Sequence, residues 1–354
     1  MIVPRHLADE NPHFAFFGIL AGSAGNNNLH DRTDISGKRG KQMQSELNQE
    51  LLQNVWEEII HKTKQSKNNR LYHYTNVNGL LGIIKDRGFW VSKADFLNDS
   101  EEIIYINRIL DGVFDKFQTM VKTQFTEDET SRQLWAMYLK VMGEVRDRIE
   151  YSGEELEIFV LSMSENPDSL TLWYNYASGD GYCVGLDTLE FISAFSVDNG
   201  ILHDDLYCVI GEVVYERSEQ EEQLLTSFLK LFSFVKEHLY QIADLEKTLF
   251  LGIVATIIGH SIFFKDANFA NEEEFRLAFI SKDLANQVKF RGRRGVIMPY
   301  IDFQLKDKLP LRHIVIGPRN NSDIAKKGVT YFLKKSGYNL EQIQVDYSSV
   351  PLRY

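Results

Sequence analysis

The chain has 354 residues, 44% of them hydrophobic, and a formal net charge of -11 at pH 7. This length and apolar content support a substantial core, in one large domain or in a domain with an appendage. The acidic balance argues against a globally basic nucleic-acid binder, although it leaves room for a local basic groove. The two cysteines, Cys183 and Cys208, give neither a disulfide framework nor metal-ligand spacing, so a reducing cytoplasm is expected.

The N-terminal part is predicted to contain a flexible leader, residues 1–42, and a helix, residues 43–68. The leader lacks periodicity and is rich in Gly, Asn and Asp. Its apolar run at residues 14–22 follows Asp9 and Glu10 rather than a basic segment, so we do not interpret it as a signal peptide. Met43, a second candidate start, opens the helix, which we expect to pack on the main fold as a lid. Its apolar positions are Leu47, Leu51, Leu52, Val55, Trp56, Ile59 and Ile60.

The segment from Leu71 to Glu102 is predicted to form a strand, a helix and a second strand. The first strand alternates with a period of two, which places His73 on one face with Leu71 and Thr75. Thr75 or Asn76 is expected to cap the helix, whose apolar side is formed by Leu80, Leu81, Ile83 and Ile84.

The end of this unit is marked by Gly88, which is expected to close the helix in a left-handed conformation. The strand Phe89 to Ser92 follows. A polar cluster of Asp95, Asn98, Asp99 and Glu101 comes next, and we expect its last three members to act as capping and turn residues.

The middle of the chain alternates between predicted helices and strands. Helices are expected from Ser100 to about Lys122, from Asp128 to Glu150 and over the region from Ser218 to Phe264. The uncharged run Thr248 to Phe264 just reaches the length of a membrane span, but its polar residues favour a buried core helix. Strands are expected at Phe159–Met163, Tyr182–Leu186 and about Tyr207–Tyr215.

The C-terminal part is predicted to be rich in strands. Phe275, Leu277 and Phe279 alternate with polar or small residues, so a strand here places Glu274 and Arg276 on one face. Further strands are expected at 288–290, 295–301, 314–318 and 343–347, with a helix at 321–335. The chain as a whole is therefore predicted to be a mixed α+β protein.

Four separated motifs carry a family resemblance over roughly residues 70 to 340. The first contains Leu-Tyr-His-Tyr-Thr at 71–75 and Phe-Leu-Asn-Asp-x-Glu at 96–101, the second is Ser169 to Ala177, and the acidic run 272–274 comes later in the chain. In this order they resemble a large bacterial family known as a domain of unknown function. That family is in turn similar to the ADP-ribosyltransferase-like superfamily. The resemblance implies a split mixed β-sheet at residues 69–354, with helical insertions at about 100–150 and 218–264.

The resemblance also implies roles for individual residues. His73, with Tyr74 and Thr75 beside it, is expected to hold NAD, and Tyr174 or Tyr176 to pack on the nicotinamide, with Tyr176 preferred. Tyr74 stands where poly-ADP-ribose polymerases have Gly, which is closer to the pattern of DNA-modifying toxins.

The acidic run supplies the expected catalytic groups. Glu274 is expected to stabilise the positive charge that develops on the ribose, with Arg276 orienting it. Glu272 is a second carboxylate that would activate an acceptor.

A basic segment in this acidic chain is a further candidate site. Lys289, Arg291, Arg293 and Arg294 lie among glycines that let a ligand approach the backbone. A solvated loop is one interpretation. The other is a functional patch, in which Arg291 helps to clamp a pyrophosphate or the segment receives an anionic acceptor such as nucleic acid.

Each candidate residue also has an interpretation in which its role is structural and not functional. A lone strand histidine such as His73 is commonly satisfied by a neighbouring carbonyl group. The aromatic residues Trp173, Tyr174 and Tyr176 fit an ordinary core, and three consecutive acids fit a solvated turn.

The functional expectation is an enzyme that cleaves NAD, its substrate, and transfers ADP-ribose to a protein or nucleic acid, as a toxin or phage-defence effector. The alternatives are an NAD glycohydrolase, which uses water, and an inactive binding module on the same fold. The sequence contains no His-Glu-x-x-His, Cys-x-x-Cys, Walker loop or Gly-x-Ser-x-Gly motif. Metalloprotease, zinc-site, P-loop and typical serine-hydrolase functions therefore lack their usual signals.

Overall fold

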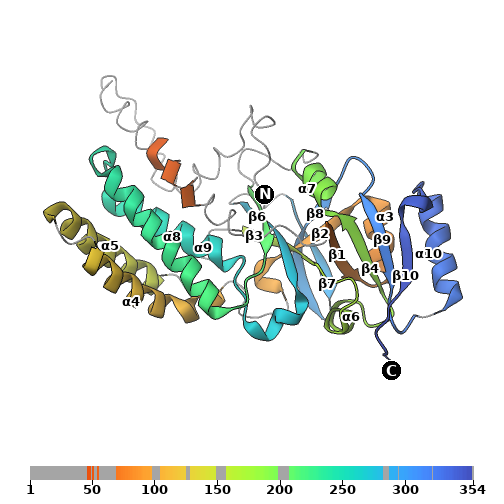
Figure 1. The fold of residues 1–354 in the computed structure, drawn as a ribbon. Helices are drawn as coiled ribbons and strands as arrows, with labels where there is room; N and C mark the ends of the chain where they lie inside the picture. Colours follow the sequence, from red (N-terminus) through yellow and green to blue (C-terminus); the bar gives the residue numbers. More distant parts are fainter. Residues whose placement is uncertain are drawn as a thin grey trace, which may run out of the picture.

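The computed structural model describes residues 46–48, 50–51, 54–55, 69–97, 104–124, 128–148, 157–197, 207–281, 287–293, 295–320 and 322–352. Over these ranges the chain is a mixed α+β fold, as predicted. A large open sheet lies beside a bundle of long helices, and shorter helices cover the sheet (Figure 1). The leader 1–42, Met43 and the polar residues Asn98, Asp99 and Glu101 lie outside the described residues.

Ten strands of the described ranges form one sheet in the order β10-β9-β4-β1-β3-β2-β8-β7, and β6 pairs with both β3 and β5. In the described pairings, β10 runs parallel to β9 and the other neighbours are antiparallel. The strands are β1 (Arg70–Thr75), β2 (Gly88–Lys93), β3 (Glu157–Ser164), β4 (Tyr182–Asp187), β5 (Tyr207–Glu212), β6 (Glu274–Ser281), β7 (Val288–Arg293), β8 (Val296–Gln304), β9 (Leu311–Ile316) and β10 (Gln344–Tyr347).

The helices differ from the predictions in four places. The helix expected from Ser100 begins at Asn107, and the region from Ser218 to Phe264 is two helices. The helices at residues 170–176 and 188–197 were not predicted. The helices are α3 (Val77–Asp86), α4 (Asn107–Gln124), α5 (Glu129–Arg148), α6 (Leu170–Tyr176), α7 (Thr188–Val197), α8 (Arg217–Glu237), α9 (Leu245–Ser261) and α10 (Asp323–Lys335).

Strand β3 separates the two main cores of the molecule. Ile158 and Val160 point to the bundle of α4, α5, α8 and α9, while Phe159, Leu161 and Met163 point to the side covered by α3, α7 and α10. All five are buried, because a strand with a core on both faces has no polar face. The bundle and the sheet therefore meet along β3 and its neighbour β6.

The sheet divides along one edge of β3. Strand β2 pairs with β3 at Phe159 and Val160, whereas β1 pairs with it at Ser164. Between these points, Leu161 to Met163 have no strand partner on that edge, although the other edge pairs with β6 along its whole length. Unpaired backbone groups in a sheet need other partners. The gap between β1 and β2 is consequently a place where side chains can replace a strand.

The unit β1-α3-β2 confirms the predicted order and corrects two details. Asn76 caps α3, accepting a hydrogen bond from the Gly79 backbone N–H at 2.9 Å. The left-handed residue at its C-terminal end is Arg87, with φ 57°, and not Gly88. Gly88 instead begins β2, where a Cβ atom would stand 1.9 Å from the Phe303 carbonyl oxygen. Leu81 is 42% exposed rather than part of the apolar side.

Helix α9 is buried nearly all round, as predicted for a core helix. Leu47, Leu51 and Val55, the described apolar residues of the predicted N-terminal helix, are also buried. The hydroxyl of Thr248 on α9 donates a hydrogen bond to the side-chain oxygen of Asn48 at 3.3 Å. Among the described residues, no helix combines the length and apolarity needed to cross a bilayer.

Candidate functional site

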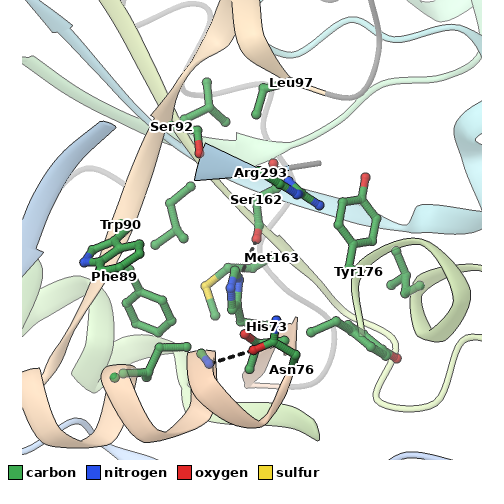
Figure 2. Close-up of a pocket in the computed structure, with 18 of the residues that line it drawn as sticks. His73, Asn76, Phe89, Trp90, Ser92, Leu97, Ser162, Met163, Tyr176 and Arg293 are labelled. Atoms are coloured by element: carbon green, nitrogen blue, oxygen red, sulfur yellow. Dashed lines mark hydrogen bonds between the residues drawn. The ribbon is translucent and has the colours of Figure 1, made fainter. Parts of the chain in front are cut away.

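A cavity of about 420 Å³ lies where the sheet divides (Figure 2). Its walls come from β1, β2, β3, α3, α6, β7, β8 and the segment from Lys265 to Glu274. This volume falls within the range of about 300–1,000 Å³ typical of small-molecule sites. Of the predicted site residues, it brings together His73, Tyr74, Thr75, Tyr176, Glu272, Glu274 and Arg291.

His73 fills part of the gap between β1 and β2. Its Nδ1 donates a hydrogen bond of 3.1 Å to the carbonyl oxygen of Ser162, one of the β3 residues without a strand partner on that edge (Figure 2). Burial lowers the pKa of His73 to about 4, the bond to Ser162 opposes this change, and the charges of Arg291 and Arg293 add to it. The ring is therefore neutral at pH 7. Since Nδ1 carries the proton, Nε2 is an acceptor.

Two carboxylates and two cations form a cluster at the other wall. Lys265 Nζ donates to Glu272 Oε2 at 2.8 Å and to Glu274 Oε2 at 2.9 Å. Arg276 donates from Nε and Nη2 to the two oxygens of Glu274 at 3.0 and 2.9 Å, and from Nη1 to the Ile262 carbonyl oxygen at 2.6 Å. All four charged side chains are buried. The cluster balances its charges, as buried ions require.

The pKa values of this cluster follow from burial and from pairing. Burial alone would lower the pKa of Lys265, but the carboxylates of Glu274 and Glu272 outweigh it and raise that pKa. Burial raises the pKa of Glu274, while the Lys265 ammonium and the Ser162 hydroxyl oppose the rise. Lys265 is therefore a fixed cation between two acids.

The local chain explains how consecutive acids come to face different directions. Glu272 ends a 3-10 helix, Ala267–Glu272, and Glu274 begins β6. Between them Glu273 has a left-handed backbone, with φ 43°, and its exposed carboxylate accepts a hydrogen bond of 2.8 Å from Asn166. Glu272 and Glu274 both turn toward Lys265. The interpretation of a fully solvated acidic turn is wrong for these two residues.

Tyr176 joins the cluster from α6. Its hydroxyl donates to Glu272 Oε1 at 3.1 Å, and its ring lines the cavity (Figure 2). Tyr174 does not line the cavity and is 70% exposed. The segment is a helix, capped by Ser169, in which residues two apart point in nearly opposite directions. The expectation that Tyr174 contacts a ligand is therefore not supported by its position.

Tyr74 and Thr75 line the cavity from the end of β1, but the Tyr74 hydroxyl is already occupied. It donates to the Asn166 carbonyl oxygen and accepts from the Ser169 backbone N–H, both at 2.8 Å. Tyr74 thus anchors the turn before α6. Arg276, unlike these residues, does not line the cavity. It donates hydrogen bonds to both oxygens of Glu274 and so orients that carboxylate.

The basic segment is a strand, β7, rather than a solvated loop. Arg291 and Arg293 line the cavity, whereas Lys289 pairs with Asp302 at 2.9 Å. Arg294 lies outside the described residues. The cavity therefore has cations on its β7 side.

The sequence patterns did not predict Lys265 as a site residue, and they indicated Arg293 only as one member of the basic segment. Lys265 is the first charge after the uncharged run that became α9, which was the available signal for a charged group at the edge of a core. Within the described ranges, no three His, Cys, Asp or Glu side chains gather as metal ligands do.

Comparisons with known proteins give one family match. Residues 172–277 match the model of a family described as a protein of unknown function, DUF2971. The matched segment contains Tyr176, Lys265, Glu272, Glu274 and Arg276, while His73 and β7 lie outside it. No curated protein and no solved structure matches the chain.

Proposed function

We propose that this protein is an ADP-ribosyltransferase-like enzyme that cleaves the bond between nicotinamide and ribose in NAD and transfers ADP-ribose to a macromolecule. One observation carries the proposal. His73, Tyr176, Glu272 and Glu274, which come from separate segments of the sequence, line a single cavity at the division of the sheet. The cytoplasmic location and the role as a toxin or phage-defence effector belong to the same proposal and rest on the sequence alone.

The neutral imidazole suits the binding of a sugar. A ring that donates from Nδ1 to Ser162 has Nε2 left as an acceptor, and a ribose hydroxyl is a matching donor. His73 acts by positioning in this scheme and transfers no proton. The ring of Tyr176 provides a flat wall for the departing nicotinamide.

The acidic cluster suits the charge of the transition state. Breaking a glycosidic bond develops positive charge on the sugar, and a fixed carboxylate nearby stabilises it. Glu274 is held through both oxygens by Arg276, so it can interact with the ribose without first reorganising. Glu272, bonded to Tyr176 and Lys265, is the carboxylate proposed to activate the acceptor.

Incubation of the protein with NAD, following nicotinamide release, tests the proposal. Glu274→Gln should reduce release by at least about 100-fold, the usual size of the loss of one electrostatic catalytic group. Glu273→Gln, one residue away and exposed, is the matched control and should retain activity. Equal activity in Glu274→Gln and wild type would remove the catalytic assignment.

The fate of the ADP-ribose separates the remaining candidates. Label from NAD that appears on protein, RNA or DNA supports a transferase. Free ADP-ribose as the sole product supports the glycohydrolase. Absence of nicotinamide release with every acceptor tested leaves a binding module.

A further inference from the structure

Arg293 is placed at the end of β7 with its side chain directed into the cavity. In Figure 2 its side chain extends toward that of Tyr176. Within the described part of the chain, Arg293 forms no ion pair, although Asp86, Glu272, Glu274 and Asp302 line the same cavity. Glu272 and Glu274 hold Lys265, and Asp302 holds Lys289.

Arg291, two residues earlier, has a different environment. Its Nη2 donates to the Ser92 hydroxyl at 2.7 Å, and its guanidinium lies 5.6 Å from the Trp90 ring centre and 5.7 Å from that of Tyr300. These contacts hold Arg291 in place. Its Nε is buried and has no hydrogen-bond partner among the described residues.

The two guanidinium groups repel one another. Burial lowers the pKa of Arg291, and the charge of Arg293 lowers it further. Both charges also act on the ring of His73. Arg291 and Arg293 both face the cavity, and Arg293 has no acidic partner among the described residues. A bound anion would therefore stabilise this pair of charges.

We infer that Arg293 binds the pyrophosphate of a nucleoside diphosphate or dinucleotide, and that Arg291 is a fixed second cation at the same subsite. A guanidinium presents paired N–H donors that match two phosphate oxygens, which an ammonium does not. The choice of a dinucleotide rests on the proposed function. The anion-binding role does not, so the two can be tested separately.

ADP is the appropriate probe because it has the pyrophosphate and lacks the bond to nicotinamide. Calorimetric titration of the full chain should detect ADP binding. Arg293→Gln should weaken it by about tenfold or more, the usual value of a hydrogen bond to a charged group. Arg293→Lys should restore part of the affinity. Arg132→Gln removes an exposed arginine on α5, outside the cavity, and should bind ADP as wild type does.

Two further ligands identify what the site recognises. Inorganic pyrophosphate should compete with ADP, whereas adenosine should bind more weakly than ADP and equally to wild type and Arg293→Gln. A single-stranded oligonucleotide that displaces ADP more effectively than pyrophosphate would assign Arg293 to a nucleic-acid backbone and overturn the dinucleotide assignment.

A measurement on the wild-type chain avoids any folding defect of the variants. Phenylglyoxal labelling with peptide mapping should modify Arg293 in the free protein and spare it at saturating ADP. The inference is wrong if ADP fails to bind wild type, if Arg293→Gln binds it unchanged, or if ADP leaves the labelling of Arg293 unaltered. Absence of NAD cleavage would refute the proposed function without affecting these results.

Discussion

At the scale of single residues, His73 shows how a backbone gap determines protonation. The imidazole satisfies the Ser162 carbonyl group that no strand reaches, and burial keeps the ring neutral. A charged ring would need solvation that the cavity wall does not provide. The same bond that satisfies the backbone therefore also directs the acceptor nitrogen away from Ser162.

The lowered pKa of His73 predicts a dependence of stability on pH. The unfolded ring takes up a proton near pH 6.5, whereas the folded ring does so only near pH 4, so stability falls as the pH is lowered through this window. Between pH 7 and 5 the free energy of unfolding should fall by about 2 kcal/mol more in wild type than in His73→Asn. Asn keeps a donor for Ser162 but does not titrate. Urea unfolding measures both proteins. An equal fall in the free energy of unfolding between pH 7 and 5 would contradict the assigned pKa.

Lys265 provides the second prediction at this scale. Lys265→Met leaves Glu272 and Glu274 without their shared cation and should cost about 3–5 kcal/mol at pH 7. The loss should shrink as the pH is lowered, because burial raises the pKa of Glu274 and the variant lacks the Lys265 ammonium that opposes this rise. Lys140→Met, which removes an exposed ammonium, is the control. Adding Glu272→Gln to Lys265→Met should recover part of the loss in urea unfolding, and additive effects would show that the two groups do not interact.

At the scale of elements, the turn from α3 to β2 depends on close backbone packing. Arg87 takes the left-handed conformation that Gly88 was expected to take. Gly88 is instead the first residue of β2 and packs against β8. The position of its missing Cβ is occupied by the backbone of β8. The glycine therefore permits strand pairing rather than helix termination.

A pair of glycine substitutions tests this explanation. Gly88→Ala forces β2 and β8 apart and should destabilise the fold by at least about 2 kcal/mol. Gly112→Ala, inside α4 with open space around it, should stabilise by up to about 1 kcal/mol. Thermal unfolding of both variants gives the comparison. A neutral Gly88→Ala would mean that the strands can separate at little cost.

At the scale of the whole molecule, the helical bundle and the site are one structure. Helix α9 is enclosed by other helices, and the chain just after it provides the Ile262 carbonyl group for Arg276 and the side chain of Lys265. A change in the position of α9 is therefore transmitted to both cations that hold Glu274.

This connection predicts cooperative unfolding. Ile253→Ala in the fully buried part of α9 should cost about 2–5 kcal/mol, whereas Ile324→Ala, at a position 81% exposed, should change stability by less than about 0.5 kcal/mol. Far-ultraviolet circular dichroism and tryptophan fluorescence should report one coincident transition in each protein. Two separated transitions would show that the bundle and the sheet fold independently.

The sequence by itself determined the elements whose patterns are local. The alternation around Phe275, Leu277 and Phe279 predicted β6 and the shared face of Glu274 and Arg276, and the helical periodicity predicted α4 and α5. Helix α7 was missed, because its short apolar run at 188–197 has little polar contrast between faces. The α+β class followed from these elements, whereas the candidates His73, Tyr176, Glu272 and Glu274 came from the family resemblance of the motifs that contain them.

Only the tertiary structure decided how these residues meet. The pairing of β1 and β2 with different parts of β3 opens the cavity, and the bond from Tyr176 to Glu272 joins residues 96 positions apart. Local spacing cannot specify such contacts, because they depend on strand order and register. The same reason explains why Tyr174 is excluded, why Lys265 stands between two acids and why Arg293 faces the cavity.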